Sequence, residues 1–178
     1  MKAVFLDRDG VLNKPVIKDG KPYPPSSVAD FEIYPEVFVA LRKLRQMNFR
    51  ICVVTNQPDV ARGIQKQSVV EAMHRRLRDA LGIKDFYICW HDDADHCDCR
   101  KPKPGLITRA AADHRIFLPG SYMIGDRWRD VNCGLAAGCR TIFIDRGYNE
   151  SLRREPHFRA LNLGEAIDII VSQERHST

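Results

Sequence analysis

Two aspartates, Asp7 and Asp9, are the first residues along the chain whose spacing could do chemistry; they lie in the segment Asp-Arg-Asp-Gly. They follow the apolar run at residues 3–6, which has the composition of a buried strand. A further carboxylate, Asp126, follows a second apolar run. Clustered carboxylates repel one another, and a hard divalent cation with oxygen ligands is the simplest compensation. Asp7 and Asp126 around Mg²⁺ therefore indicate phosphoryl chemistry.

Groups that suit a phosphate lie further along the chain. Lys101, in the segment Arg-Lys-Pro, could neutralise both the carboxylates and the oxygens of a transferring phosphoryl group. The Thr55 hydroxyl and neighbouring backbone N–H groups could hold the same oxygens. The chain has no Gly-x-x-x-x-Gly-Lys segment, which disfavours a kinase that uses a nucleoside triphosphate.

Alternating strands and helices must position these residues. Apolar runs predict strands at 3–6, 50–55, 86–90, 122–125 and 141–145, and amphipathic patterns predict helices at 36–47, 68–81, 105–114, 130–137 and 163–171. This alternation predicts an α/β fold with a parallel sheet and helices on both faces. Asp7, Thr55 and Asp126 each follow a strand, so we expect them to converge at the carboxyl edge of the sheet.

A cysteine and histidine cluster suggests a second metal. Cys89, His91, Cys97 and Cys99 offer three thiolates and one imidazole within eleven residues, which suits a closed tetrahedral zinc site. His96 is a competing imidazole, and a set of free surface thiols is the alternative to a metal site. Four protein ligands leave no open position, so we expect zinc to stiffen the loop rather than to catalyse.

Size and charge set broader limits. We expect one domain over residues 1–171 and a disordered tail over 172–178 of the 178-residue chain. The formal net charge of +5 favours anionic partners, but the basic residues are spread along the chain, so nucleic acid is the minor interpretation. With no membrane-spanning stretch and no secretory signal, we expect a cytoplasmic protein, and we expect a monomer.

Four segments in order are similar to the four motifs of haloacid dehalogenase (HAD) superfamily phosphatases: Asp-Arg-Asp-Gly at 7–10, Thr-Asn-Gln at 55–57, Arg-Lys-Pro at 100–102 and Ile-Gly-Asp at 124–126. The resemblance runs from about residue 3 to residue 147 and is strongest to the branch of histidinol phosphatases and heptose-bisphosphate phosphatases. It implies a HAD-like Rossmannoid three-layer sandwich around a central parallel sheet, with a zinc-binding loop before the Arg-Lys motif.

The same resemblance implies roles for individual residues. Asp7 attacks phosphorus and forms an aspartyl-phosphate, while Asp9 protonates the leaving oxygen and then activates water. Mg²⁺ is held by the Asp7 carboxylate, the Asp9 backbone carbonyl and Asp126. Asp130 either supports this site or only begins a helix. Thr55 and Lys101 assist catalysis, and the expected substrate contacts are Thr55, Asn56, Gln57, Arg100, Lys101 and Arg127.

Two features bear on specificity. The spacing between motifs is too short for an inserted cap domain, so we expect an essentially capless enzyme whose flap is the segment 14–27. The family usually continues Thr-Asn-Gln with Ser-Gly, whereas this chain has Pro58 and Asp59. Proline removes a backbone donor, and aspartate adds negative charge near a phosphate site.

The substrate implied by the resemblance is a sugar bisphosphate, D-glycero-D-manno-heptose 1,7-bisphosphate at its 7-phosphate. This reaction belongs to the synthesis of nucleotide-activated heptose for the lipopolysaccharide core. Histidinol phosphate is the nearest alternative substrate. The positive charge and capless site keep a nucleic-acid 3'-end phosphatase open as a second class, and a non-catalytic zinc-stabilised binding module is a third.

Overall fold

A six-stranded parallel sheet forms the centre of the computed structural model, which describes residues 1–175. Its strands are β1 (Ala3–Leu6), β4 (Arg50–Asn56), β5 (Asp85–Cys89), β6 (Tyr122–Gly125), β7 (Arg140–Ile144) and β8 (Phe158–Ala160). The helices are α1 (Glu36–Gln46), α2 (Pro58–Ala61), α3 (Gln67–Leu81), α4 (Gly105–His114), α5 (Trp128–Ala136) and α6 (Leu163–Arg175). Among residues 1–175, none of these helices is long and apolar enough to cross a membrane.

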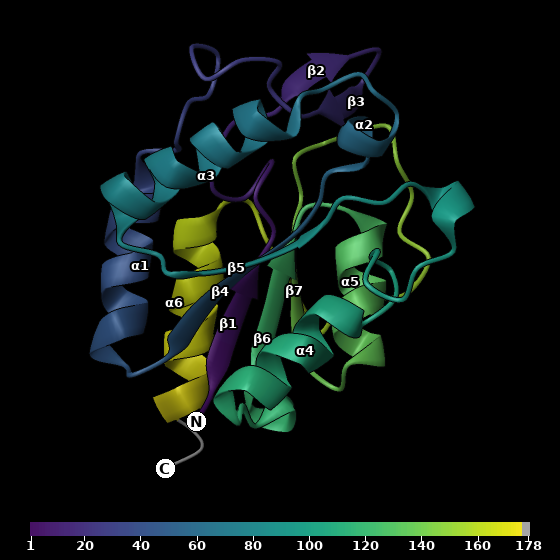
Figure 1. The fold of residues 1–178 in the computed structure, drawn as a ribbon. Helices are drawn as coiled ribbons and strands as arrows, with labels where there is room; N and C mark the ends of the chain where they lie inside the picture. The colour runs from purple at the N-terminus through teal and green to yellow at the C-terminus, as the bar shows by residue number, and fades with distance from the viewer. Residues whose placement is uncertain (176–178) are drawn as a thin grey trace.

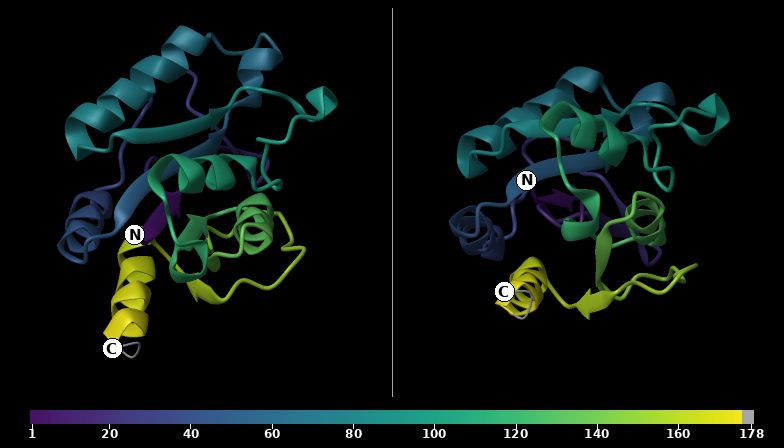
Figure 2. Two further views of the ribbon diagram at one scale, coloured as in Figure 1. Left: turned by 60° about the horizontal axis from the view of Figure 1, so that its bottom comes forward. Right: turned by 90° about the horizontal axis from the view of Figure 1, so that it is seen from below.

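Two hydrophobic clusters hold the helices against the sheet. Side chains of a strand alternate between its two faces, and in β1 Val4 and Leu6 enter one cluster while Ala3 and Phe5 enter the other. The first cluster also contains apolar side chains of α1, α3 and α6, and the second those of α4 and α5. Figures 1 and 2 show α1 and α6 on one side of the sheet and α4 and α5 on the other. The expected three-layer sandwich is confirmed.

The strand order places the reversal of the sheet at its centre. The order β5-β4-β1-β6-β7-β8 puts β4 on one side of β1 and β6 on the other. The chain builds outward from β1 to β5 and then returns to build the other half from β6 to β8. In open parallel sheets, ligands bind beyond the carboxyl ends of the strands at such a point. Asp7, Asn56 and Asp126 lie at the ends of these three central strands.

The structure contains elements that the sequence patterns did not predict. Within the expected flap, the short strands β2 (Val16–Lys18) and β3 (Lys21–Tyr23) form an antiparallel hairpin. The strand β8 lies at the edge of the sheet and pairs with β7. It was not predicted because its three residues are too few to show the alternation of apolar and polar residues that identifies a strand. No cap domain is inserted among residues 1–175; the hairpin and the loop after β5 are the additions near the site.

The expected disordered tail was wrong over residues 172–175. Helix α6 continues beyond the expected end near Val171 and ends at Arg175. Glu174, in its last turn, pairs with Lys2 at 2.6 Å and accepts a hydrogen bond from the Tyr122 hydroxyl at 3.3 Å. These contacts hold the end of α6 against β6 and against Lys2, the residue before β1. A local sequence pattern does not reveal such long-range contacts. Residues 176–178 lie outside the described part of the chain.

Gly134 tests how closely α5 packs on the sheet. A Cβ at this position would lie 2.6 Å from Met123 Cβ and 2.6 Å from Thr141 Cγ2. We expect Gly134→Ala to lower the free energy of unfolding by about 1–3 kcal/mol, because the added methyl group would push α5 away from β6 and β7. Gly164→Ala is the control, because its Cβ would meet only Asn162 Oδ1 at 3.1 Å. Urea denaturation measures the free energy of unfolding of both variants. Equal values for Gly134→Ala and Gly164→Ala would contradict the packing argument.

Candidate active site

Lys101 forms the buried centre of the site. Its Nζ lies 2.9 Å from Asp7 Oδ1 and 2.6 Å from Asp130 Oδ1, and it donates to the Val54 carbonyl at 2.9 Å. The lysine is 2% exposed. Burial would lower its pKa, but the two carboxylates outweigh that effect and raise the pKa, so the ammonium stays charged. One cation therefore joins the end of β1 to the first turn of α5.

The carboxylates around Lys101 have the properties of a cation site. Ligand oxygens of Asp7, Asp126 and Asp130 all lie within 4.8 Å of one another. Both Asp126 oxygens are buried without a well-aligned hydrogen bond among the described residues, and the neighbouring Tyr148 hydroxyl is the group that lowers the pKa of this carboxylate through a hydrogen-bond interaction. Buried polar atoms are rarely left unpaired, and Mg²⁺ is typically bound by one or two carboxylates together with water and phosphate oxygens. The residues present therefore fit the expected magnesium ion.

Two glycines make room for this cluster. A Cβ on Gly10 would lie 1.7 Å from Asp126 Oδ2, and a Cβ on Gly125 would lie 2.3 Å from Asp130 Cγ. Gly10 also has φ of +85°, a conformation that side chains with a Cβ rarely adopt. The glycines of the first and last motifs thus let the backbone approach the carboxylates closely.

Burial and like charges shift the pKa values of the cluster upward. Burial raises the pKa of Asp7 to about 6, although Lys101 opposes the shift. The pKa of Asp126 is raised well above its usual range by burial and then by the charges of Asp7 and Asp130. A bound divalent cation would favour the ionised carboxylates and reverse these shifts.

Asp9 lies in the opposite electrostatic environment. Arg8 NH2 donates to Asp9 Oδ2 at 2.7 Å, Asn13 donates to Asp9 Oδ1 at 2.9 Å, and Gln57 Nε2 donates to Asp9 Oδ2 at 3.1 Å. Burial alone would raise the pKa of Asp9, but the Arg8 charge and these hydrogen bonds together lower it. Sequence reasoning missed Arg8 as a site residue, although its place between the two aspartates was a visible signal.

The segment after β4 supports both halves of the site. Gln57 Nε2 also donates to Thr55 Oγ1 at 3.0 Å, so Gln57 lies between Thr55 and Asp9. Asn56 makes two hydrogen bonds of 3.1 Å with the backbone N–H and carbonyl of Lys101. Thr55 and Asn56 line the active-site cavity. Asn56 therefore holds the Lys101 backbone in place, whatever contact it makes with a substrate.

Arginines surround a cavity of about 220 Å³ above the carboxylates. Arg100 donates to Asp93 Oδ1 at 2.8 Å, and Arg127 pairs with Glu150. Two arginines that were not predicted also line the cavity, Arg62 on the segment after α2 and Arg129 on α5. All four guanidiniums carry acidic partners, since Arg62 contacts Asp59 and Asp92 and Arg129 contacts Asp93. The hairpin covers the same cavity with Pro22, Tyr23 and Pro24.

Pro58 and Asp59 stand where the family usually has Ser-Gly, and both residues fit the local structure. Pro58 is the first residue of α2, where a helix needs no backbone donor. The Asp59 carboxylate lies 3.3 Å from Arg62 NH1, so its charge is partly neutralised. The proline therefore breaks no helical hydrogen bond, and the added charge is partnered.

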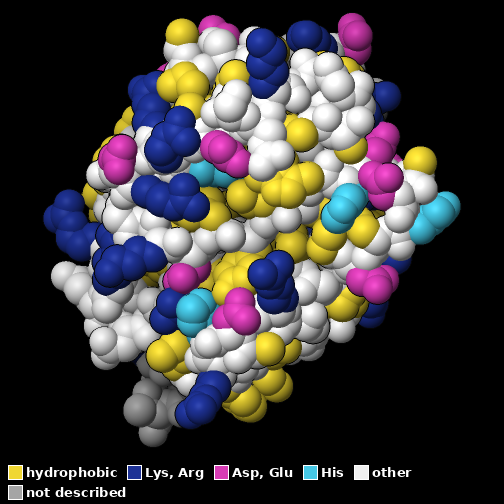
Figure 3. Space-filling view, viewed as in Figure 1, with side chains coloured by type: hydrophobic (Ala, Val, Ile, Leu, Met, Phe, Trp, Pro, Cys, Tyr) yellow, Lys and Arg dark blue, Asp and Glu magenta, His cyan; other side chains and the backbone are white. Residues whose placement is uncertain are grey.

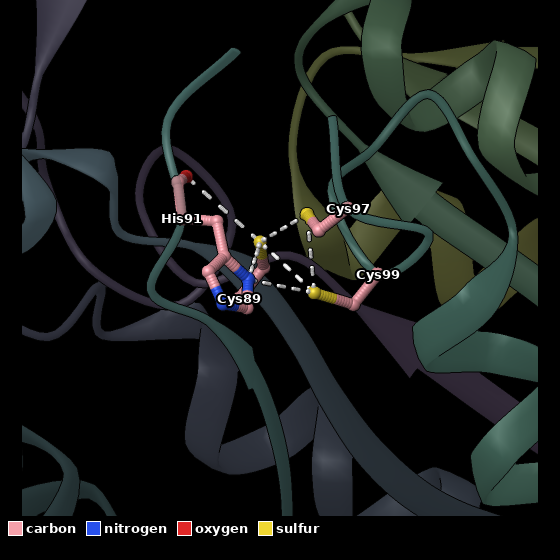
Figure 4. Close-up of side chains that lie close together, drawn as sticks. All are labelled: Cys89, His91, Cys97 and Cys99. Atoms are coloured by element: carbon pink, nitrogen blue, oxygen red, sulfur yellow. Dashed lines mark hydrogen bonds between the residues drawn. The ribbon is translucent and has the colours of Figure 1, made fainter. Parts of the chain in front are cut away.

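The four expected zinc ligands come together in the loop after β5 (Figure 4). The three sulfur atoms of Cys89, Cys97 and Cys99 lie 3.2–3.7 Å apart, and His91 Nδ1 lies 3.3 Å from Cys99 Sγ. Tetrahedral ligands with Zn–S bonds of about 2.3 Å would lie roughly 3.7 Å apart. His96, the competing imidazole, caps the turn Asp93–Asp95 and is outside the cluster. The geometry therefore favours His91.

Known proteins resemble the chain over nearly its whole length. A family model described as "HAD-hyrolase-like" matches residues 98–166. D-glycero-beta-D-manno-heptose-1,7-bisphosphate 7-phosphatase of Helicobacter pylori is 36% identical over 177 residues, covering 95% of this chain and 97% of the relative. The D-glycero-alpha-D-manno-heptose-1,7-bisphosphate 7-phosphatase of Photorhabdus laumondii is 32% identical and covers 81% of this chain and 82% of its own length.

A solved structure agrees with this similarity. D,D-heptose 1,7-bisphosphate phosphatase from B. bronchiseptica, complexed with magnesium and phosphate, superimposes with a TM-score of 0.84 at 27% identity. The superposition covers 97% of this chain and 99% of the other. On these sequence and structural similarities, the chain belongs to the heptose-bisphosphate phosphatases of the HAD superfamily.

Proposed function

We propose that the protein hydrolyses D-glycero-D-manno-heptose 1,7-bisphosphate at its 7-phosphate through an aspartyl-phosphate on Asp7. The observation that carries the proposal is the cluster at the sheet centre, where Asp7 lies 2.9 Å from Lys101 Nζ and beside the buried Asp126 carboxylate. A nucleophilic carboxylate, a fixed cation and a free metal ligand at one strand edge suit phosphoryl transfer. The names of the relatives supply the substrate.

The residues of the first and last motifs would also hold magnesium. The proposed ligands are the Asp7 carboxylate, the Asp9 backbone carbonyl and Asp126, with Asp130 supporting Lys101. When bound, Mg²⁺ would neutralise phosphoryl oxygens and orient the phosphate. Lys101 would balance the charge that develops on the same oxygens, and Asp7 would attack phosphorus. The Thr55 hydroxyl lies at the end of β4, where it can donate to a phosphoryl oxygen.

Asp9 would serve both half-reactions as the proton carrier. It protonates the sugar oxygen as the bond between that oxygen and phosphorus breaks, and later takes a proton from the water that attacks the aspartyl-phosphate. Its lowered pKa keeps it ionised in the free site, which suits the base role. A phosphate dianion beside Asp9 would raise that pKa, since a like charge disfavours the carboxylate. Substrate binding therefore prepares Asp9 for its role as acid.

The rim of the cavity suits a substrate with a second anionic group. Two of the predicted substrate contacts are arginines. Arg100 comes from the loop with the cysteine cluster, and Arg127 comes from the start of α5. Their carboxylate partners, Asp93 and Glu150, hold the guanidiniums in place without a substrate. A guanidinium binds phosphate in a bidentate manner, so the rim favours a bisphosphate over a monophosphate of a cationic alcohol such as histidinol.

Zinc would have a structural role in this arrangement. The cluster ends at Cys99, directly before Arg100 and Lys101. Closed four-ligand sites stabilise a fold and leave no position for a substrate. We therefore propose that zinc stabilises the loop and that magnesium takes part in the reaction.

The surface favours a small substrate over nucleic acid. In Figure 3, Lys and Arg side chains gather on the left of this face, over α3, with some Asp and Glu among them. Nucleic-acid sites typically continue a basic patch along a groove, whereas each of the four arginines that line the active-site cavity contacts an acidic side chain. A soluble sugar phosphate as substrate also suits action in the cytoplasm.

A substrate panel tests the reaction. We expect phosphate release from the alpha or beta anomer of the heptose bisphosphate to exceed release from histidinol phosphate and from a 3'-phosphorylated oligonucleotide by at least tenfold, because only the bisphosphate engages the arginine rim. Asp7→Asn should abolish turnover. Equal, slow rates on every compound would contradict the sugar assignment, and full activity of Asp7→Asn would contradict the mechanism.

Magnesium binding has a consequence for stability. Because the folded-state pKa of Asp126 is raised, its ionised form destabilises the metal-free protein at every pH above its unfolded value of 3.8. Asp126→Asn should therefore stabilise the EDTA-treated protein by about 1 kcal/mol, or roughly 2–4 °C in Tm, and should remove the stabilisation by added Mg²⁺.

The exposed Asp168 on α6 supplies the control for this measurement. Asp168→Asn should keep the wild-type response to Mg²⁺ in thermal denaturation. The assignment of Asp126 as a magnesium ligand is rejected if its Asn variant responds to Mg²⁺ as the wild type does.

Zinc content tests the cysteine cluster. Purified protein should contain about one equivalent of zinc by elemental analysis. Cys97→Ser should lower both the zinc content and the Tm, since the loop loses one of four ligands. His96→Asn is a matched control, because Asn tolerates the positive φ of 49° at this position. Zinc loss from His96→Asn, with retention in His91→Asn, would reverse the choice of imidazole.

A further inference from the structure

Arg8 is a fully buried arginine beside the reacting groups, with an exposed fraction of 0%. It lies between the nucleophile Asp7 and the acid/base Asp9 in the sequence, and its side chain points to Asp9. Arg8 NH2 reaches Asp9 Oδ1 at 3.0 Å and Oδ2 at 2.7 Å, and Nε reaches Oδ2 at 3.1 Å. A paired guanidinium and carboxylate of this kind fixes the plane of the carboxylate as well as its charge.

Two other segments also contact the guanidinium, and His74 contacts the nitrogen that does not face Asp9. Arg8 NH2 donates to Gln57 Oε1 at 3.2 Å, and NH1 lies 3.2 Å from His74 Nε2. A guanidinium has donors only, so His74 Nε2 must accept this hydrogen bond. The imidazole is then neutral, with its proton on Nδ1.

His74 is itself held in one position. It is 1% exposed on α3, its ring centroid lies 5.2 Å from that of Phe86, and Trp90 lies beyond at 6.4 Å. Burial and the neighbouring Arg8 charge lower the pKa of His74 to about 3, which agrees with its role as acceptor. His74 does not line the active-site cavity. Among the described residues, its hydrogen bond toward the reacting groups is the one with Arg8.

We propose that His74 is a positioning residue for the general acid/base, acting through Arg8 to fix the orientation of the Asp9 carboxylate. This inference rests on the proposed function, in which Asp9 moves the proton in both half-reactions. Without an acceptor at position 74, Arg8 NH1 would be buried and unpaired, at a cost that favours rotation of the guanidinium. The Asp9 carboxylate would then lose the paired geometry that aims it at the phosphate.

A pair of substitutions separates the acceptor from the volume of His74. His74→Leu fills the site with an apolar side chain and removes the acceptor, whereas His74→Gln supplies a carbonyl oxygen that can accept from Arg8. General acid–base catalysis contributes about 10²–10⁴-fold, so we expect His74→Leu to lower kcat on the heptose bisphosphate at least tenfold. KM should stay within about twofold of the wild type, since His74 lies outside the cavity. His74→Gln should recover most of kcat.

A more direct measurement is the fraction of labelled phosphoenzyme, trapped by rapid acid quenching during turnover of a substrate with a labelled phosphate group. With p-nitrophenyl phosphate, whose phenolate leaves without a proton, the step most sensitive to Asp9 is hydrolysis of the aspartyl-phosphate. His74→Leu should therefore accumulate more labelled phosphoenzyme than the wild type, and His74→Gln should not. A purely structural role would lower the amount of active protein without changing this steady-state fraction.

Leu77→Ala supplies the matched control for damage to the core. Leu77 is fully buried on the same helix and belongs to the hydrophobic cluster. We expect it to lose stability in urea without a change in the phosphoenzyme fraction. Wild-type kinetics in His74→Leu, or the same partitioning as in Leu77→Ala, would overturn the inference alone. Failure of the wild type to form any phosphoenzyme would overturn the proposed function, and this inference with it.

Discussion

The contact between Lys101 and the carboxylates at the sheet centre is the interaction on which the site depends. Asp7, Asp126 and Asp130 place three acidic groups within 4.8 Å, and one buried ammonium contacts two of them. Such a group is stable only if its charges are fixed by geometry, because burial penalises every unpaired ion. Asp126 makes no hydrogen bond with this ammonium, and we propose its carboxylate as a ligand for the magnesium ion.

Lys101 is positioned from several parts of the chain at once. Asn56 binds its backbone at both the N–H and the carbonyl, and the cysteine cluster ends two residues before it. Arg100, between them, is fixed by Asp93 in the same loop. The zinc that we propose for this loop would therefore act on the reaction by fixing the position of the Lys101 ammonium, in addition to any contact of Arg100 with a substrate.

The two aspartates of the first motif show how a shared local sequence acquires two functions. Burial raises the pKa of Asp7 to about 6, against the opposing charge of Lys101. Burial acts on Asp9 as well, but Arg8 and its hydrogen bonds reverse the sign of the shift. Both residues follow β1, which ends at Leu6, and in this loop Asp7 contacts Lys101 whereas Asp9 contacts Arg8, Asn13 and Gln57. These separate partners underlie the two roles that we propose, nucleophile and metal ligand for Asp7 and proton carrier for Asp9.

The local features of this protein can be read from its sequence. The five longer strands, the five longer helices, the residues that follow each strand and the cysteine and histidine cluster can all be recognised within a few neighbouring positions, because period and ligand spacing are local. The short helix α2 was not predicted, and which groups pair depends on the folded chain. Arg8 finds His74 66 positions away, and Gln57 turns to Asp9 rather than to the cavity. The hairpin, β8 and the last turn of α6 likewise depend on distant contacts. Those pairings follow from burial and hydrogen bonding between segments that lie far apart in the sequence, which no local pattern encodes.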